Sequence, residues 1–160
     1  MNTLTFRYSD LYEDADFIYQ MLYRFILEKT GDPKQDLHAE LHPGQQTLLA
    51  IDESGRKIGG MVFYRLNSPR SIYINYFVLG ETVRRMGYGR MIFEEFFSWA
   101  KKNGVEYLDV RSNAYMAPGF YLKMGFHVTG EVKEPHPLCP DNIHYSFRIY
   151  LQPGNQVESK

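Results

Sequence analysis

An apolar strand-like run, a glycine-containing turn and a helix-like run follow one another without interruption in residues 71–90, SIYINYFVLGETVRRMGYGR. Backbone N–H groups in such a turn, together with the unpaired amides and positive dipole end of the following helix, favour an anion at the junction. Arg84, Arg85 and Arg90 place positive charge around the same point. This order of elements predicts a site for a phosphorylated ligand between a strand and a helix.

Strand-like and helix-like runs in the rest of the chain predict an α/β domain over residues 1–151, with a polar tail at 152–160 that we expect to be disordered. Strands are expected at residues 4–8, 46–52, 57–66, 71–79, 105–110, 127–133 and 144–151, the last closing the sheet. Helices are expected from residue 11 to residue 30 and at residues 35–41, 88–102 and 117–124.

The strand predicted at residues 71–79 should be central in the sheet because both of its faces are largely apolar. Strict alternation would place Tyr73, Asn75 and Phe77 on one face, and Ile74 and Val78 on the other. This strand and the two before it should form an antiparallel meander. The helix at residues 88–102 should then return the chain through a right-handed crossover, so that the next strand is parallel.

The charge balance and the cysteine count exclude several classes of protein. The net charge is -1, and the absence of a long basic run argues against a nucleic-acid or acidic-membrane partner. Cys139 is the only cysteine, so no intramolecular disulfide can form and a reducing compartment fits best. Because the first residues lack a signal-peptide pattern and no apolar run reaches membrane-spanning length, we expect a cytoplasmic protein.

His38 and His42 are four residues apart and would face the same side of a helix, as zinc-binding histidines do. The metalloprotease motif, however, has a glutamate directly after the first histidine, where this chain has Ala39, and no third ligand is evident. We therefore expect no metal, and we interpret this polar segment as a border of a substrate pocket.

Gly87 and Gly89 fit neither of the two best-known phosphate loops. A dinucleotide fingerprint needs a third glycine at the position of Ile92, and a Walker loop needs a Gly-Lys-Ser/Thr ending, which is missing. Taken alone, the two glycines indicate only a tight turn. A second segment farther along the chain, APGFYLKMGF at residues 117–126, changes this interpretation.

With the two segments in register, the chain resembles the GNAT superfamily of acyl-CoA-dependent N-acyltransferases over residues 4–151. Residues 84–89, RRMGYG, match the family's R/Q-x-x-G-x-G/A signature, and residues 117–126 match its recurrent A-x-x-F-Y-x-K-x-G-F segment. The resemblance implies the GNAT fold, a mixed α/β architecture. Its central sheet, of roughly six to seven strands, splays open at an acetyl-CoA cleft and is flanked by roughly four helices.

The resemblance also implies which residues hold acetyl-CoA. The pantetheine arm would pair, as an added strand does, with the backbone of Phe77, Val78 and Leu79. The pyrophosphate would be wrapped by the backbone of Arg85, Met86, Gly87, Tyr88, Gly89 and Arg90. Arg84 occupies the first signature position. The chain departs from the family where Glu81 replaces a frequent proline and Ala114 a frequent asparagine, and a one-residue shift would give the contact of that asparagine to Asn113.

Acetyl transfer to an amine needs a neutral amine, a positioned carbonyl, donors to the carbonyl oxygen and a proton for the departing thiolate. By its family position Tyr121 is the candidate acid, since a tyrosine pKa of about 10 lies near that of a thiol leaving group. The carbonyl oxygen would accept from a backbone N–H near Val78 or Leu79. Candidates to line the acceptor pocket are Tyr73, Asn75 and His144. No general base is obvious, and the weaker candidates are Glu40, Glu81 and His144.

The predicted function is transfer of an acetyl group from acetyl-CoA to a primary amine of a small molecule, by direct attack in a ternary complex. Open alternatives are a peptide or protein N-acetyltransferase, an acyl-CoA sensor of the same fold without efficient turnover, and a structural interaction protein. The polar content of residues 30–44 and 134–142 would suit a polar or cationic amine. A homodimer is also open, because exposed aromatic edges near the last strands would bury readily.

Overall fold

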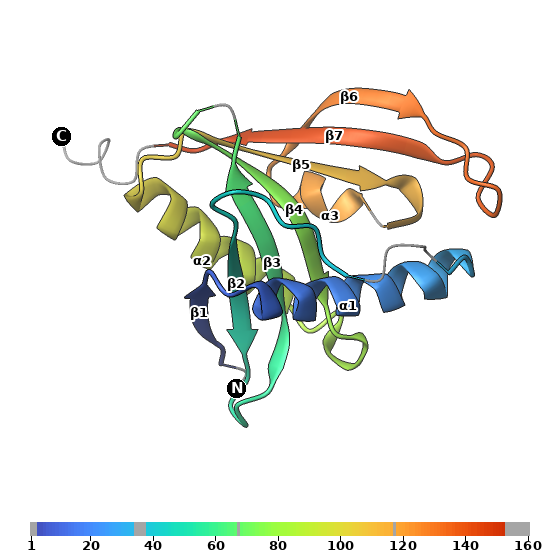
Figure 1. Cartoon of the computed structure of the whole chain (residues 1–160). Helices are drawn as coiled ribbons and strands as arrows, with labels where there is room; N and C mark the ends of the chain where they lie inside the picture. Colours follow the sequence, from blue (N-terminus) through green and yellow to red (C-terminus); the bar gives the residue numbers. More distant parts are fainter. Residues whose placement is uncertain (1–2, 34–37, 67, 117, 153–160) are drawn as a thin grey trace.

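A seven-stranded mixed sheet organises the computed structural model, which describes residues 3–33, 38–66, 68–116 and 118–152 (Figure 1). Its strand order is β1-β2-β3-β4-β5-β7-β6. The strands are β1 Thr5–Ser9, β2 Gln46–Ile51, β3 Lys57–Arg65, β4 Ser71–Leu79, β5 Tyr107–Asn113, β6 His127–Lys133 and β7 Ile143–Tyr150. The helices are α1 Tyr12–Thr30, α2 Tyr88–Lys102 and α3 Gly119–Lys123, with 3₁₀ turns at Glu81–Val83 and Ala114–Met116. The expected mixed α/β architecture is confirmed.

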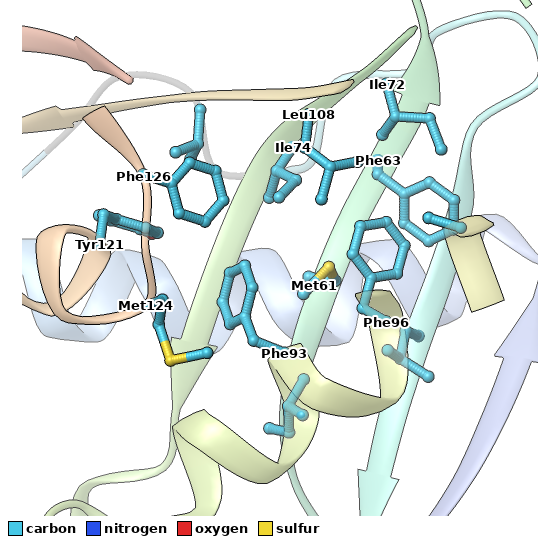
Figure 2. Close-up of a cluster of buried hydrophobic side chains, with 14 of the residues drawn as sticks. Met61, Phe63, Ile72, Ile74, Phe93, Phe96, Leu108, Tyr121, Met124 and Phe126 are labelled. Atoms are coloured by element: carbon cyan, nitrogen blue, oxygen red, sulfur yellow. The ribbon is translucent and has the colours of Figure 1, made fainter. Parts of the chain in front are cut away.

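Helices cover both faces of the sheet. On one face, Ile18 of α1 packs in a cluster with Val62 of β3 and Val78 of β4. On the opposite face, α2 and α3 lie over a larger cluster in which Phe93 and Phe96 are fully buried (Figure 2). β4 is therefore enclosed between the two helical layers, as its apolar residues on both faces predict.

The strand pairing confirms most of the expected topology. β2, β3 and β4 form an antiparallel meander, β4 is the central strand, and β4 and β5 are parallel across the α2 crossover. The last strand differs from the expectation, because β7 lies between β5 and β6 and β6 forms the edge. β5 also runs to Asn113, beyond its predicted end at residue 110, because its last three residues pair with β7.

A β-bulge in β4 overturns the predicted division of its side chains between the two faces. Val62 of β3 pairs with Tyr76 and Phe63 pairs with Ile74, so Asn75 is an extra residue on β4. The alternation reverses at this residue. Ile74 and Phe77 consequently pack in the same core, under α2, whereas strict alternation places them on opposite faces. The expectation that Tyr73 and Asn75 share a face with Phe77 was wrong for this reason.

β4 and β5 diverge after a short paired stretch. Pairing runs from Ser71 with Tyr107 to Ile74 with Val110, after which β5 continues along β7. On the β5 side, the backbone of residues 75–79 therefore has no partner strand. The splay that the resemblance implies is present, and it begins at the bulge.

The structure has three α-helices in its described residues, one fewer than expected. Of the helix predicted at residues 35–41, residues 35–37 lie outside the described part, and residues 38–41 are not helical. Pro33 and Pro43 bracket a segment too short to form a stable helix without extensive packing. Residue 117, the predicted first residue of α3, and residues 153–160 of the tail also lie outside the described part.

Candidate active site

A cavity of about 460 Å³ opens where β4 and β5 diverge. The predicted site residues that line it are Tyr73, Asn75, Phe77, Val78, Leu79, Arg84, Arg85, Asn113, Tyr121 and His144. Its remaining lining residues, which were not among the predicted site residues, are Leu22, Phe25, Ile26, Tyr76, Val110, Arg111, Ser112, Met116 and Phe120. In α1, helical spacing indicated only core packing. In β5, no local pattern shows that a strand borders an opening, because the opening depends on how two distant segments pair.

The turn before α2 has the backbone geometry of an anion site. Arg85 is the one described non-glycine residue with a positive φ, at 67°, and Gly87 follows in the left-handed region at 83°. Gly87 caps α2, and the first bond within the helix is donated by the Met91 N–H to the Gly87 carbonyl. The amides of Tyr88, Gly89 and Arg90 precede this bond, so they have no partner within the helix. The left-handed geometry and these amides favour an anion.

Two of the three arginines at the turn, Arg84 and Arg90, differ in how many contacts they make with the rest of the protein. Arg84 donates from Nε to the Leu79 carbonyl at 3.1 Å, and its guanidinium lies 4.5 Å from the centroid of the Phe25 ring. It also approaches Glu28 of α1 at 3.6 Å, so it fixes the end of β4 against α1. Arg90 has only a loose contact with Glu94 in the following turn.

Gly89 lies where the start of α2 meets α3. A Cβ on this residue would stand 3.0 Å from Cε1 of Phe120, and the Phe120 ring stacks on Phe77 of β4 at 5.5 Å between centroids. The second glycine of the signature therefore makes room for an aromatic side chain of the cavity wall. At Gly89 the predicted phosphate turn thus packs closely against the segment that carries Tyr121.

Tyr121 is a buried side chain that reaches the cavity from α3. Its ring packs edge-on against Phe93 and Phe126 (Figure 2). The centroid of the Phe147 ring lies 5.5 Å away. Within the described part of the chain its hydroxyl has no hydrogen-bond partner. Burial raises the pKa of Tyr121, and nearby Tyr73 adds to the shift. The hydroxyl is thus protonated. It is also a weaker acid than a tyrosine with the ordinary pKa of about 10, the value that was compared with the pKa of the thiol leaving group.

A side-chain network holds His144 at the cavity wall. His144 Nδ1 lies 3.0 Å from Asn113 Oδ1 and 3.2 Å from Glu134 Oε1. Asn142 donates from Nδ2 to the same Asn113 oxygen at 2.8 Å, and Asn113 Nδ2 donates to the Tyr115 hydroxyl at 3.3 Å. The Asn113 side chain, expected to contact CoA, is therefore engaged with other side chains and orients the imidazole.

The other candidates for the general base occupy less favourable positions. Glu40 lies at the bulge, where its Oε1 accepts from Asn75 Nδ2 at 3.4 Å and from the His42 ring at 2.8 Å. Glu81 is an exposed residue of a 3₁₀ turn and does not line the cavity.

The two histidines considered as a metal pair face different partners. His38 contacts Asp16 at 3.5 Å and His42 contacts Glu40. Within residues 3–33, 38–66, 68–116 and 118–152 no three histidine, cysteine, aspartate or glutamate side chains are grouped as metal ligands. In the same ranges no helix is long and apolar enough to cross a membrane.

Solved structures of several acetyltransferases resemble this fold. An acetyltransferase from Bacillus cereus ATCC 14579 is 25% identical, with a TM-score of 0.59 over 80% of this chain and 86% of its own. A Bacillus anthracis str. Ames protein, solved in complex with acetyl coenzyme A, is 22% identical, with a TM-score of 0.59 over 74% of this chain and 73% of its own. Nourseothricin acetyltransferase is 16% identical, with a TM-score of 0.63 over 93% of this chain and 99% of its own. No curated protein matches the sequence.

The model of the acetyltransferase (GNAT) family matches residues 8–126. This match extends from β1 to the end of the segment that carries Tyr121, so it includes both motifs on which the resemblance rests. The splayed sheet and the turn with left-handed residues agree with it. The chain belongs to the acetyltransferase (GNAT) family.

Proposed function

We propose that the protein transfers an acetyl group from acetyl-CoA to a primary amine of a small molecule, by direct attack of the amine in a ternary complex. One observation carries this proposal: a single cavity is bordered by the unpaired edge of β4, by Arg84 and Arg85 of the turn and by Tyr121. A cleft of this kind lets a long cofactor arm and a reacting group meet.

The residues present fit acetyl-CoA. The free edge of residues 75–79 offers main-chain donors and acceptors of the kind that bind an extended chain. The first amides of α2, with Arg85 and Arg90, suit the pyrophosphate. When bound, acetyl-CoA supplies the acetyl group as a thioester and leaves as a thiol. A backbone N–H near Val78 or Leu79 would donate to the thioester carbonyl oxygen.

Tyr121 fits the role of general acid. Its hydroxyl is protonated, lines the cavity and has no competing partner among the described residues. A proton held at the Tyr121 oxygen would pass to the departing sulfur as the carbon–sulfur bond breaks.

His144 fits the role of general base better than the alternatives. The two atoms near its Nδ1, an amide oxygen and a carboxylate oxygen, can only accept, so Nδ1 carries a proton. Nε2 then has a free lone pair and no partner within the described residues. Nε2 would take a proton from the amine, and the Glu134 carboxylate would stabilise the resulting imidazolium.

Two measurements test the proposal in sequence. Calorimetry with acetyl-CoA should give saturable binding, and no binding at millimolar concentration would contradict the assignment. Release of free thiol should then depend on an added amine, measured across a panel of small amines and a peptide with a free N-terminus. Binding without thiol release from any acceptor would indicate a sensor, and turnover with the peptide alone would indicate a peptide acetyltransferase.

A further inference from the structure

Arg111 is a cation between two cavities, and it forms no ion pair with any carboxylate of the described residues. It lines the cavity between β4 and β5, and it also lines a second cavity of about 440 Å³ over β4, β5 and β7. Its guanidinium carbon lies 6.0 Å from the centroid of the Tyr73 ring. Tyr73 and Asn75 also line both cavities, so the second cavity continues from the first across these residues.

The one carboxylate that lines the second cavity is already neutralised. Arg148 donates from Nε to Asp109 Oδ1 at 2.7 Å and from Nη2 to Asp109 Oδ2 at 3.0 Å. This bidentate pair satisfies both partners. Arg111 therefore remains as an uncompensated positive charge, and no ion pair involves it anywhere in the described chain.

We propose that Arg111 binds an anionic group on the acceptor, and that the acceptors of this enzyme are amines that carry a carboxylate, as amino acids do. This inference rests on the proposed acetyl transfer and narrows its substrate class. It narrows the expectation of a polar or cationic amine, which rested on the composition of residues 30–44 and 134–142, to a polar amine with a negative group.

The register of β5 and β7 sets the spacing between the two groups that the acceptor would contact. Asn113 pairs with His144, and Arg111, two residues earlier on the same face of β5, pairs with Ser146. The backbones of Arg111 and His144 are thus diagonal neighbours, about 7 Å apart. The long Arg111 side chain can cover part of this distance. An amine near His144 and a carboxylate at Arg111 would then belong to one compact molecule.

The second cavity gives the rest of such an acceptor somewhere to lie. Its lining combines hydroxyl groups from Tyr64, Thr129 and Ser146 with the Asp109–Arg148 pair. These groups offer hydrogen bonds without an unpaired charge to oppose the acceptor. We therefore expect selection for the carboxylate to be stronger than selection for the side chain that lies in this cavity.

The test compares free amino acids with their methyl esters, which keep the amine and lose the negative charge. Methionine, phenylalanine and leucine are each assayed as acid and ester with the wild type, with Arg111→Gln and with Arg24→Gln. Arg24 is an exposed arginine of α1 outside both cavities, so it is the matched control. The measured quantity is the ratio of kcat/KM for the acid to kcat/KM for the ester. The acid and the ester differ in amine basicity, but this difference is the same for every enzyme variant and cancels when the ratios are compared.

The ratio should fall about 10- to 100-fold in Arg111→Gln, the value of a hydrogen-bonded ion pair, and stay within twofold of wild type in Arg24→Gln. An unchanged ratio in an active enzyme, or acetylation of uncharged amines but no amino acid, would overturn the inference and leave the proposed function standing. Tenfold weaker acetyl-CoA binding by Arg111→Gln would assign the residue to the cofactor instead. If the wild type binds acetyl-CoA but acetylates no amine, the proposed function itself fails.

Discussion

The proposed cofactor half and the proposed acceptor half of the cleft are built in different ways. The cofactor half is local in sequence, because the free edge of β4, the turn and the first amides of α2 all lie within residues 75–91. The acceptor half joins distant segments: Asn113 on β5, Glu134 after β6 and His144 on β7. The first half relies on backbone groups that most residue types supply. The second relies on particular side chains, so it can change its acceptor without disturbing the cofactor.

Tyr121 stands where the halves meet, and its removal should have the largest effect. Tyr121→Phe keeps the ring packing and removes only the hydroxyl, so we expect kcat to fall about 10²- to 10⁴-fold while the Kd for acetyl-CoA stays within twofold. Thiol release under saturating substrates and calorimetry measure the two quantities. Tyr107→Phe, outside both cavities, is the control. Full turnover in Tyr121→Phe would remove the acid assignment.

The raised pKa of Tyr121 makes a prediction about pH. The acid acts in its protonated form, which is present below the pKa and lost as pH rises through it. Because burial raises this pKa, the hydroxyl stays protonated up to about pH 10, the ordinary tyrosine value, and beyond. The ratio of kcat between wild type and Tyr121→Phe should therefore be constant from about pH 7 to about pH 10. A ratio that falls within this range would show that the hydroxyl ionises there.

His144 tests whether the acceptor half acts independently. We expect His144→Gln to lower kcat/KM for the amine about 10- to 100-fold. The loss should not be complete, because an ordered water molecule can still accept the proton from the amine. Acetyl-CoA binding should not change. Glu134→Gln should have a smaller effect in the same direction, and adding it to His144→Gln should cost nothing further, because the carboxylate acts through the imidazole. Additive losses would separate the two residues.

Gly87 and Gly89 test the cofactor half, and they should respond differently. Gly87→Ala places a side chain in the left-handed region, with a φ of 83° and no atom within 4 Å. The backbone cost of about 1–2 kcal/mol should appear as a 5- to 30-fold weaker Kd for acetyl-CoA, because the turn relaxes when empty. Gly89→Ala instead meets the Phe120 ring at 3.0 Å.

Shortening the Phe120 side chain distinguishes the steric cause at Gly89 from the backbone cause at Gly87. Phe120→Leu should restore acetyl-CoA binding to Gly89→Ala, since it removes the atoms that the new methyl group contacts. It should not restore binding to Gly87→Ala, whose difficulty lies in the backbone. Calorimetry with acetyl-CoA on the two glycine variants, each with and without Phe120→Leu, measures the Kd values. If Phe120→Leu restored binding to both glycine variants, steric contact with Phe120 would be the cause at both positions.

The contrast between the halves also explains what the sequence could predict. The glycines, arginines and apolar run of residues 71–90 lie next to each other, so their joint geometry follows from local rules. The bulge at Asn75 was missed because a one-residue shift depends on the pairing of β3 with β4, and both alternative faces of β4 are apolar. The network of His144 was missed because β7 inserts between β5 and β6, which no local pattern indicates.

Asn113 should show the smallest effect, and it decides where the boundary between the halves lies. Family resemblance assigns it to CoA, whereas its Oδ1 contacts His144 and Asn142. We expect Asn113→Ala to lower kcat roughly fivefold, because Glu134 still holds the imidazole, and to leave the Kd for acetyl-CoA within twofold. His144→Gln should suppress the effect on kcat. A weaker Kd for acetyl-CoA with unchanged kcat would instead assign Asn113 to the cofactor half. The hydrogen bonds around His144 would then be a consequence of β5–β7 pairing and have no part in the reaction.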